Sequence, residues 1–127
     1  MTSGADDGYF DHLHRIEELE ERIRQIRRLN DEARVTGLWC LLIFSSGLHV
    51  LGPQALREIR QIVADCKDFD PDNDVYEEHD FGAVDFGGHR IFWKIDYYNK
   101  SLSQASTDPA NERVTTRVLT IMLAEEY

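Results

Sequence analysis

The chain has 127 residues, of which 42% are hydrophobic and 30% are charged, and its net charge is −10. This length corresponds to one domain, and this composition is typical of a globular chain rather than of a disordered or membrane-embedded one. The negative charge argues against direct binding of nucleic acid. Because the longest apolar run, residues 38–44, is too short to span a membrane and the first residues do not resemble a secretory signal, we expect a cytoplasmic protein that binds no membrane.

The N-terminal part of the chain predicts a short tail and a long helix. Residues 1–8 are small and acidic, so we expect a disordered tail followed by a single domain over residues 9–127. Apolar residues then recur at spacings of three and four, which predicts a helix over residues 10–34. The stripe either covers the domain's own sheet or forms a homodimer through residues 10–34. It consists of Leu13, Ile16, Leu19, Ile23, Ile26 and Leu29.

The next part of the chain predicts a strand and a second helix. Residues 38–44 are apolar at every position, as in a central strand that is covered on both faces. Pro53 suits the first turn of a helix, which we expect over residues 53–67. Cys40 and Cys66 fall in these two segments and belong to no cysteine or histidine cluster. We therefore expect two reduced core thiols and no structural zinc.

Gly87 and Gly88 separate two runs that predict a β-hairpin, with strands over residues 78–85 and 89–97. A two-residue turn at these glycines sets the register of the two strands. It pairs Asp85 with Arg90, Ala83 with Phe92, Phe81 with Lys94, and His79 with Asp96. Asp80 then falls at the end of the core face, where it needs a partner.

The C-terminal part predicts a third helix near residues 111–126, which starts at about Pro109 or Ala110 with Asp108 as its N-cap. Its buried stripe consists of Val114, Val118, Ile121 and Met122. The element order α-β-α-β-β-α then predicts an α+β fold, in which three helices pack a three-stranded, mainly antiparallel sheet. The predicted core consists of Trp39, Leu41, Ile43, Trp93, Ile95, Val118, Ile121 and Met122.

Residues 68–85, which we call the acidic block, hold eight acidic residues and no Lys or Arg. Such a block is either a solvated loop or a surface that binds a basic protein partner. The candidate partner-binding residues are Asp68, Asp70, Asp72, Asp74, Glu77, Glu78, Asp80 and Asp85. The first three have the spacing of a calcium loop, but Asn73 stands where that loop needs Gly, and His79 where it needs Glu. We expect no metal and no cofactor.

One face of the predicted hairpin offers an alternative function, because it carries His79, Lys94 and Asp96. A His beside a carboxylate can act as a general base, and a Lys can stabilise developing negative charge. However, no nucleophile accompanies them, and cross-strand charge pairs commonly stabilise a sheet. We therefore expect a binding protein that is not an enzyme, and we keep a small enzyme using these three residues as the alternative.

Three stretches of the chain resemble one known family: residues 73–82 (NDVYEEHDFG), 92–98 (FWKIDYY) and 117–127 (RVLTIMLAEEY). They resemble an uncharacterised domain-of-unknown-function family of small bacterial proteins, frequent in alphaproteobacterial chromosomes, plasmids and integrated elements. The resemblance covers roughly residues 26–127 and implies a mobile-element context. Together with the acidic block, this context suggests an inhibitor of anti-CRISPR or anti-restriction type, which binds a host nucleic-acid-handling or defence complex in competition with nucleic acid. A housekeeping partner-binding domain is the plainer alternative.

Overall fold

The structure is a computed structural model that describes the backbone of residues 4–127 and the side chains of residues 8–127. Its elements in chain order are α1 (Gly4–Thr36), β1 (Cys40–Phe44), α2 (Ser46–His49), α3 (Pro53–Asp65), β2 (Phe81–Phe86), β3 (His89–Tyr98), β4 (Thr116–Leu123) and the 3-10 turn η1 (Ala124–Glu126). The α+β class is confirmed. Residues 1–3 of the predicted tail lie outside the described residues, and residues 4–8 belong to α1.

The sheet has four strands instead of the predicted three, in the order β1-β4-β3-β2, with β1 parallel to β4 and the other pairs antiparallel. β4 occupies much of the segment that was predicted as the helix over residues 111–126. That prediction was wrong because the spacing of Val118, Ile121 and Met122 fits a helix and also a strand that is buried on both faces. All three are buried, as is Leu119, so side chains on both faces of β4 are covered.

β1 is an edge strand of the sheet and not a central one. Leu41 and Ile43 are 44% and 47% exposed, and Trp39, directly before the strand, is 46% exposed. Their prediction as core residues was wrong, because an apolar run does not reveal how many strands flank it. The other five predicted core residues are buried: Trp93, Ile95, Val118, Ile121 and Met122.

The hairpin of β2 and β3 has the predicted register from Phe81 to Arg90. Gly87 and Gly88 have φ angles of 54° and 81°, which a two-residue hairpin turn requires and glycine adopts without strain. The predicted pair of His79 with Asp96 does not form, because β2 begins only at Phe81. Glu77 and His79 both have positive φ angles, and these turn the chain away from the sheet before the strand starts.

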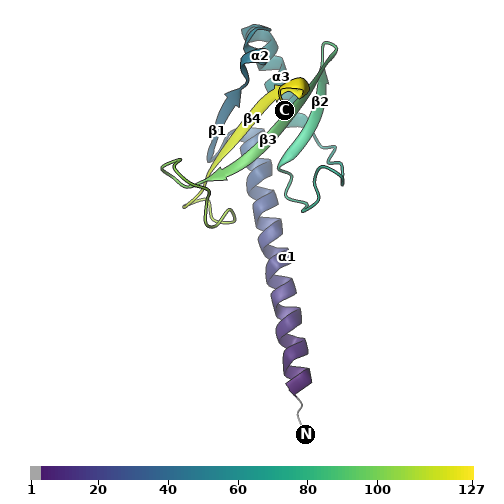
Figure 1. Ribbon diagram of the computed structural model, residues 1–127, viewed down its shortest axis with the longest axis vertical. Coiled ribbons are helices and arrows are strands. Elements are labelled where there is room, and N and C mark those ends of the chain that lie inside the picture. Colours follow the sequence, from purple (N-terminus) through teal and green to yellow (C-terminus); the bar gives the residue numbers. More distant parts are fainter. Residues whose placement is uncertain (1–3) are drawn as a thin grey trace.

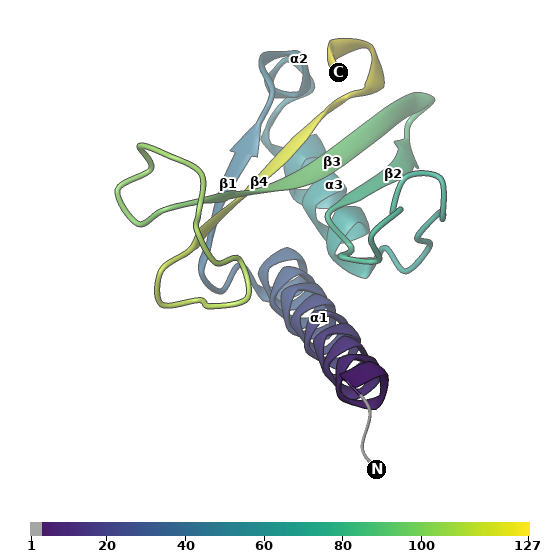
Figure 2. The ribbon, with the colours of Figure 1, turned by 60° about the horizontal axis from the view of Figure 1, so that its bottom comes forward.

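Helices cover one face of the sheet. α3 and the C-terminal part of α1 pack against each other on the face that carries Ile91, Trp93, Ile95, Leu119 and Ile121. Figures 1 and 2 show α3 behind the sheet, and α1 leaving the body of the domain. On the opposite face, the ring of Tyr127, after η1, packs against Phe81 and Phe92. The fold is therefore a two-layer domain, from which the N-terminal half of α1 projects.

Candidate functional site: the anchored acidic block

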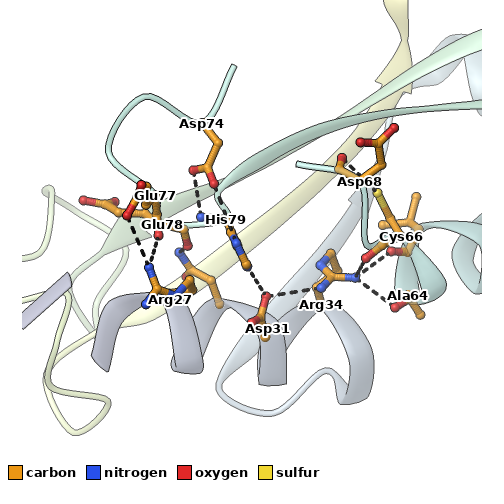
Figure 3. A network of polar contacts seen from close by, with 12 residues as sticks. Arg27, Asp31, Arg34, Ala64, Cys66, Asp68, Asp74, Glu77, Glu78 and His79 are labelled. Atoms are coloured by element: carbon orange, nitrogen blue, oxygen red, sulfur yellow. Dashed lines mark hydrogen bonds and ion pairs between the residues drawn. The ribbon is translucent and has the colours of Figure 1, made fainter. Parts of the chain in front are cut away.

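The acidic block is fastened to α1 by three side chains of that helix. Arg27 Nη1 donates a hydrogen bond to the backbone oxygen of Glu77 at 3.0 Å, and Asn30 Nδ2 donates one to the backbone oxygen of Glu78 at 2.9 Å. At the next residue of α1, Asp31 Oδ1 lies 3.0 Å from His79 Nδ1 (Figure 3). The three contacts fix three consecutive residues of the block, 77–79.

Arg34 fixes the end of α3 and the start of the block to the same helix, and its guanidinium carbon lies 5.3 Å from the ring centroid of Phe69. Its side chain is 4% exposed, and its Nη2 lies 3.2 Å from Asp31 Oδ1. Its Nη1 donates hydrogen bonds of 2.8–3.0 Å to backbone oxygens at the C-terminal end of α3, which belong to Val63, Ala64 and Cys66. These carbonyls lie where a helix leaves its acceptors unsatisfied and attracts positive charge. Asp31 therefore joins the two ends of the loop between α3 and β2.

His79 lies at the centre of this arrangement. Its ring stacks on Phe69, with ring centroids 3.6 Å apart and an interplanar angle of 2°. Its backbone N–H donates a hydrogen bond of 2.9 Å to Asp74 Oδ1, and its Nε2 lies 3.7 Å from Asp74 Oδ2. Two carboxylates, those of Asp31 and Asp74, thus contact opposite nitrogens of one imidazole. This geometry assigns His79 a role in holding the loop.

The eight acidic residues of the block divide into inner and outer ones. Asp74 is 6% exposed, Glu78 accepts a hydrogen bond of 2.7 Å from the Tyr97 hydroxyl, and Asp80 is half-buried. Burial, together with the bond to Glu78, raises the pKa of Tyr97, so this phenol keeps its proton. The remaining five side chains are exposed, and we call them the outer carboxylates: Asp68, Asp70, Asp72, Glu77 and Asp85.

Beside the block, the open face of the sheet holds a hollow of about 480 Å³, whose lining includes Asp80, Lys94 and Asp96. Lys94 Nζ lies 2.9 Å from Asp96 Oδ2, and this hydrogen bond raises the pKa of Lys94. Burial raises the pKa of Asp80 to about 6, and the negative charges of Glu78, Asp74 and Asp96 add to the effect. A carboxyl group of this kind exchanges its proton close to neutral pH.

The structure separates the three residues of the alternative catalytic site. Lys94 and Asp96 form an ion pair on the open face, whereas His79 contacts Asp31 of α1 on the helix-covered side. Asp80 stands in place of His79 beside the ion pair. The side chains lining the hollow, in the part of the chain that the structure describes, include no Ser, Thr, Cys or His. The hollow therefore offers a proton donor and a cation without a serine, threonine or cysteine nucleophile.

Sequence reasoning missed the residues of α1 that hold the block: Arg27, Asn30, Asp31 and Arg34. Asn30 and Arg34 are buried next to Leu29 and Ala33, on the side of α1 that faces the domain. The sequence pattern that could have revealed these residues is therefore the presence of two polar residues, Asn30 and Arg34, at positions where the apolar stripe of the helix continues. A buried polar side chain needs a partner, and these two have theirs in the loop and at the end of α3.

Within residues 8–127, no group of three or more His, Cys, Asp or Glu side chains has an arrangement that could hold a metal ion. Among the described helices, none combines the length and the apolar character that crossing a membrane requires.

These features define a small two-layer α+β domain, in which a carboxylate-rich loop is fastened to the N-terminal helix. The chain belongs to a protein family of unknown function, DUF3768, whose family model matches residues 44–126, more than half of the chain. The resemblance to an uncharacterised domain family is thereby confirmed, while α1 and most of β1 precede the matched residues. Neither the curated proteins nor the solved structures contain a match to this chain.

Proposed function

We propose that this chain is a small binding protein whose outer carboxylates contact a basic protein surface. The observation that supports this proposal is the anchoring of the acidic block by Arg27, Asn30, Asp31 and Arg34. A loop that serves only solubility needs no fixed conformation. A charged surface that is fixed before it binds loses less conformational entropy on association, and its affinity gains accordingly.

The negative charge of the chain supports the proposal that its partner is a protein that handles nucleic acid. The net charge is −10, and the acidic block contains eight acidic residues and no Lys or Arg. The electrostatic field of such a charge distribution accelerates association with basic surfaces, and the carboxylates then compete with phosphate groups for those surfaces. In the mobile-element context that the family resemblance implies, the partner is a host nucleic-acid-handling or defence complex. We place this role in the cytoplasm, where unpaired thiols such as those of Cys40 and Cys66 persist.

Charge reversal of the outer carboxylates tests the proposal. The test variant carries Asp68→Lys, Asp72→Lys and Glu77→Lys, three exposed side chains. Asp74 and Glu78 are left intact because their carboxylates accept hydrogen bonds that hold the fold. The matched control carries Glu18→Lys, Glu58→Lys and Glu125→Lys, which change the net charge equally at exposed sites outside the block.

Both variants and the native chain serve as bait for affinity capture from a bacterial lysate, followed by quantitative mass spectrometry. We expect a protein that the native chain and the control capture, that the test variant loses, and that added duplex DNA displaces. Binding should also weaken as the salt concentration rises, since exposed charges are screened beyond about 8 Å at physiological ionic strength. The proposal is overturned if no captured protein distinguishes the test variant from the control.

One observation favours the enzyme as the second candidate function. A pKa of about 6 suits Asp80 to proton transfer near neutral pH, and Lys94 and Asp96 line the same hollow. The variant Asp80→Asn separates the two candidates. An enzyme that acts through Asp80 loses its biological activity in this variant and keeps it after charge reversal of the outer carboxylates. A binding protein of the proposed kind shows the opposite pattern.

A further inference from the structure

The projecting half of α1 exposes a row of large apolar side chains. Tyr9, Phe10 and Leu19 are 60–68% exposed, and Leu13 and Ile16 are 37% and 38% exposed. In Figure 1, no other element lies beside this half of the helix. By contrast, Ile26, Leu29 and Ala33 in the second half of α1 are buried. The N-terminal half of α1 therefore exposes an apolar stripe to solvent, and this stripe continues the stripe through which α1 packs against its own domain.

Three of these five exposed residues, together with Ile23, follow the a and d spacing of a two-stranded coiled coil, while Phe10 and Leu13 fall at positions b and e. Tyr9, Ile16 and Ile23 are seven residues apart and occupy position a of a heptad, and His12 and Leu19 then occupy position d. A β-branched residue at a, combined with Leu at d, favours parallel two-stranded coiled coils. The row of a and d residues, which we call the seam, ends near Ile23. The next d residue, Ile26, is only 4% exposed because the chain's own domain buries it.

The charges that flank the seam also favour the parallel orientation. Arg15 occupies position g, and Glu20 occupies the following position e. In a parallel pair, the g side of one helix lies beside the e side of the other, so Arg15 meets Glu20 of the second copy. In an antiparallel pair, each flank meets its own kind, which sets Arg15 against arginine and Glu20 against glutamate. Arg22, the next g residue, is occupied within its own chain by Asp108.

We propose that residues 9–23 of α1 form a parallel coiled coil with a second copy of this chain. Two heptads make a short seam, so the dimer is reversible and its population depends on protein concentration. Both domains then lie at the same end of the coiled coil, and the two acidic blocks are presented together. A partner with two basic sites would bind such a dimer with a higher apparent affinity than the monomer.

Sedimentation equilibrium over a concentration series tests dimerisation, with Ile16→Glu as the disrupting variant. The control is His14→Glu, an exposed side chain on the opposite side of α1 that pairs with Glu18. We expect the native chain and the control to approach the dimer mass, and Ile16→Glu to remain at the monomer mass. Circular dichroism should show the same thermal midpoint for the folded domain in both variants. A native chain that stays monomeric, or an Ile16→Glu variant that dimerises equally, overturns the proposal.

Oxidation of the variant Tyr9→Cys tests the orientation. Two residues at position a face each other in a parallel pair, whereas an antiparallel pair centred on Ile16 separates the two copies of residue 9 by about 21 Å along the helix axis. Because a disulfide requires Cα atoms within about 7 Å, only the parallel pair can cross-link. We expect Tyr9→Cys to form a disulfide-linked dimer, and the native chain and His14→Cys to form none. Equal cross-linking in Tyr9→Cys and His14→Cys overturns the parallel arrangement.

Discussion

Asp80 is the residue whose ionisation should have a clear effect on the stability of the fold. Burial is the main cause that raises its pKa, from an ordinary value of 3.8 to about 6, and nearby carboxylates add to it. The folded protein therefore binds this proton more tightly than the unfolded chain does. Linkage then requires the contribution of Asp80 to be most favourable below pH 3.8, to be lost between pH 3.8 and 6, and to stay constant above pH 6.

The variant Asp80→Asn removes the charge and retains the shape of the side chain. The pKa difference between 3.8 and about 6 corresponds to at most about 3 kcal/mol in the free energy of unfolding. Asp80 is only half-buried, so water screens part of this energy, and we expect a gain of about 1 kcal/mol at pH 7.5. Near pH 3, which lies below the pKa of Asp80 in both the unfolded and the folded chain, the gain should be close to zero.

Urea unfolding followed by tryptophan fluorescence at these two pH values measures the effect. The control is Asp72→Asn, an exposed carboxylate whose substitution should leave the free energy of unfolding unchanged. An Asp80→Asn variant that is equally stabilised at both pH values, or destabilised at pH 7.5, would refute the assignment of a raised pKa to Asp80.

Three further substitutions test the packing and the anchor by chemical denaturation. Trp93 is fully buried, so Trp93→Ala should cost about 3–5 kcal/mol, and a loss below about 1 kcal/mol would contradict its place in the core. Gly82 pairs with Trp93, and a Cβ at Gly82 would lie 2.5 Å from the indole ring, so Gly82→Ala should cost about 1–3 kcal/mol. The control is Gly8→Ala, whose added Cβ meets no atom within 4 Å and which should cost nothing measurable. Asp31→Ala leaves the buried Arg34 without its carboxylate and should cost about 1–2 kcal/mol; an unchanged denaturation midpoint would show that Asp31 holds nothing.

The features that local chemistry determines could be predicted from the sequence. Gly87 and Gly88 set the register of the hairpin, because a two-residue turn with positive φ angles admits one alignment of the strands. The pair of Lys94 and Asp96 was also predictable, since residues two apart on a strand share a face. Pro53 also predicted the first turn of α3, because proline is favoured at the first position of a helix.

The predictions that were wrong concern features that depend on contacts between distant parts of the chain. β1 stands at the edge because β4 is its one neighbour in the sheet; the paired residues, such as Cys40 and Arg117, are 77 positions apart, and no local pattern encodes that pairing. The helix predicted over residues 111–126 failed because a strand buried on both faces loses the alternation that identifies strands. His79 left the predicted site because its positive φ angle and its contact with Asp31, 48 residues earlier, cannot be read from the acidic run.

The central claim is that the acidic block is a fixed surface, and backbone order parameters from ¹⁵N relaxation test it most directly. The contacts of α1 with residues 77–79, the hydrogen bonds that Asp70 and Asp74 accept within the loop, and the stacking of Phe69 on His79 predict values of about 0.85 across residues 69–79, as in rigid secondary structure. The Asp31→Ala variant should lower the values at residues 77–79. Values below about 0.6 across the block in the native chain would make it a flexible solvated loop and would contradict the account.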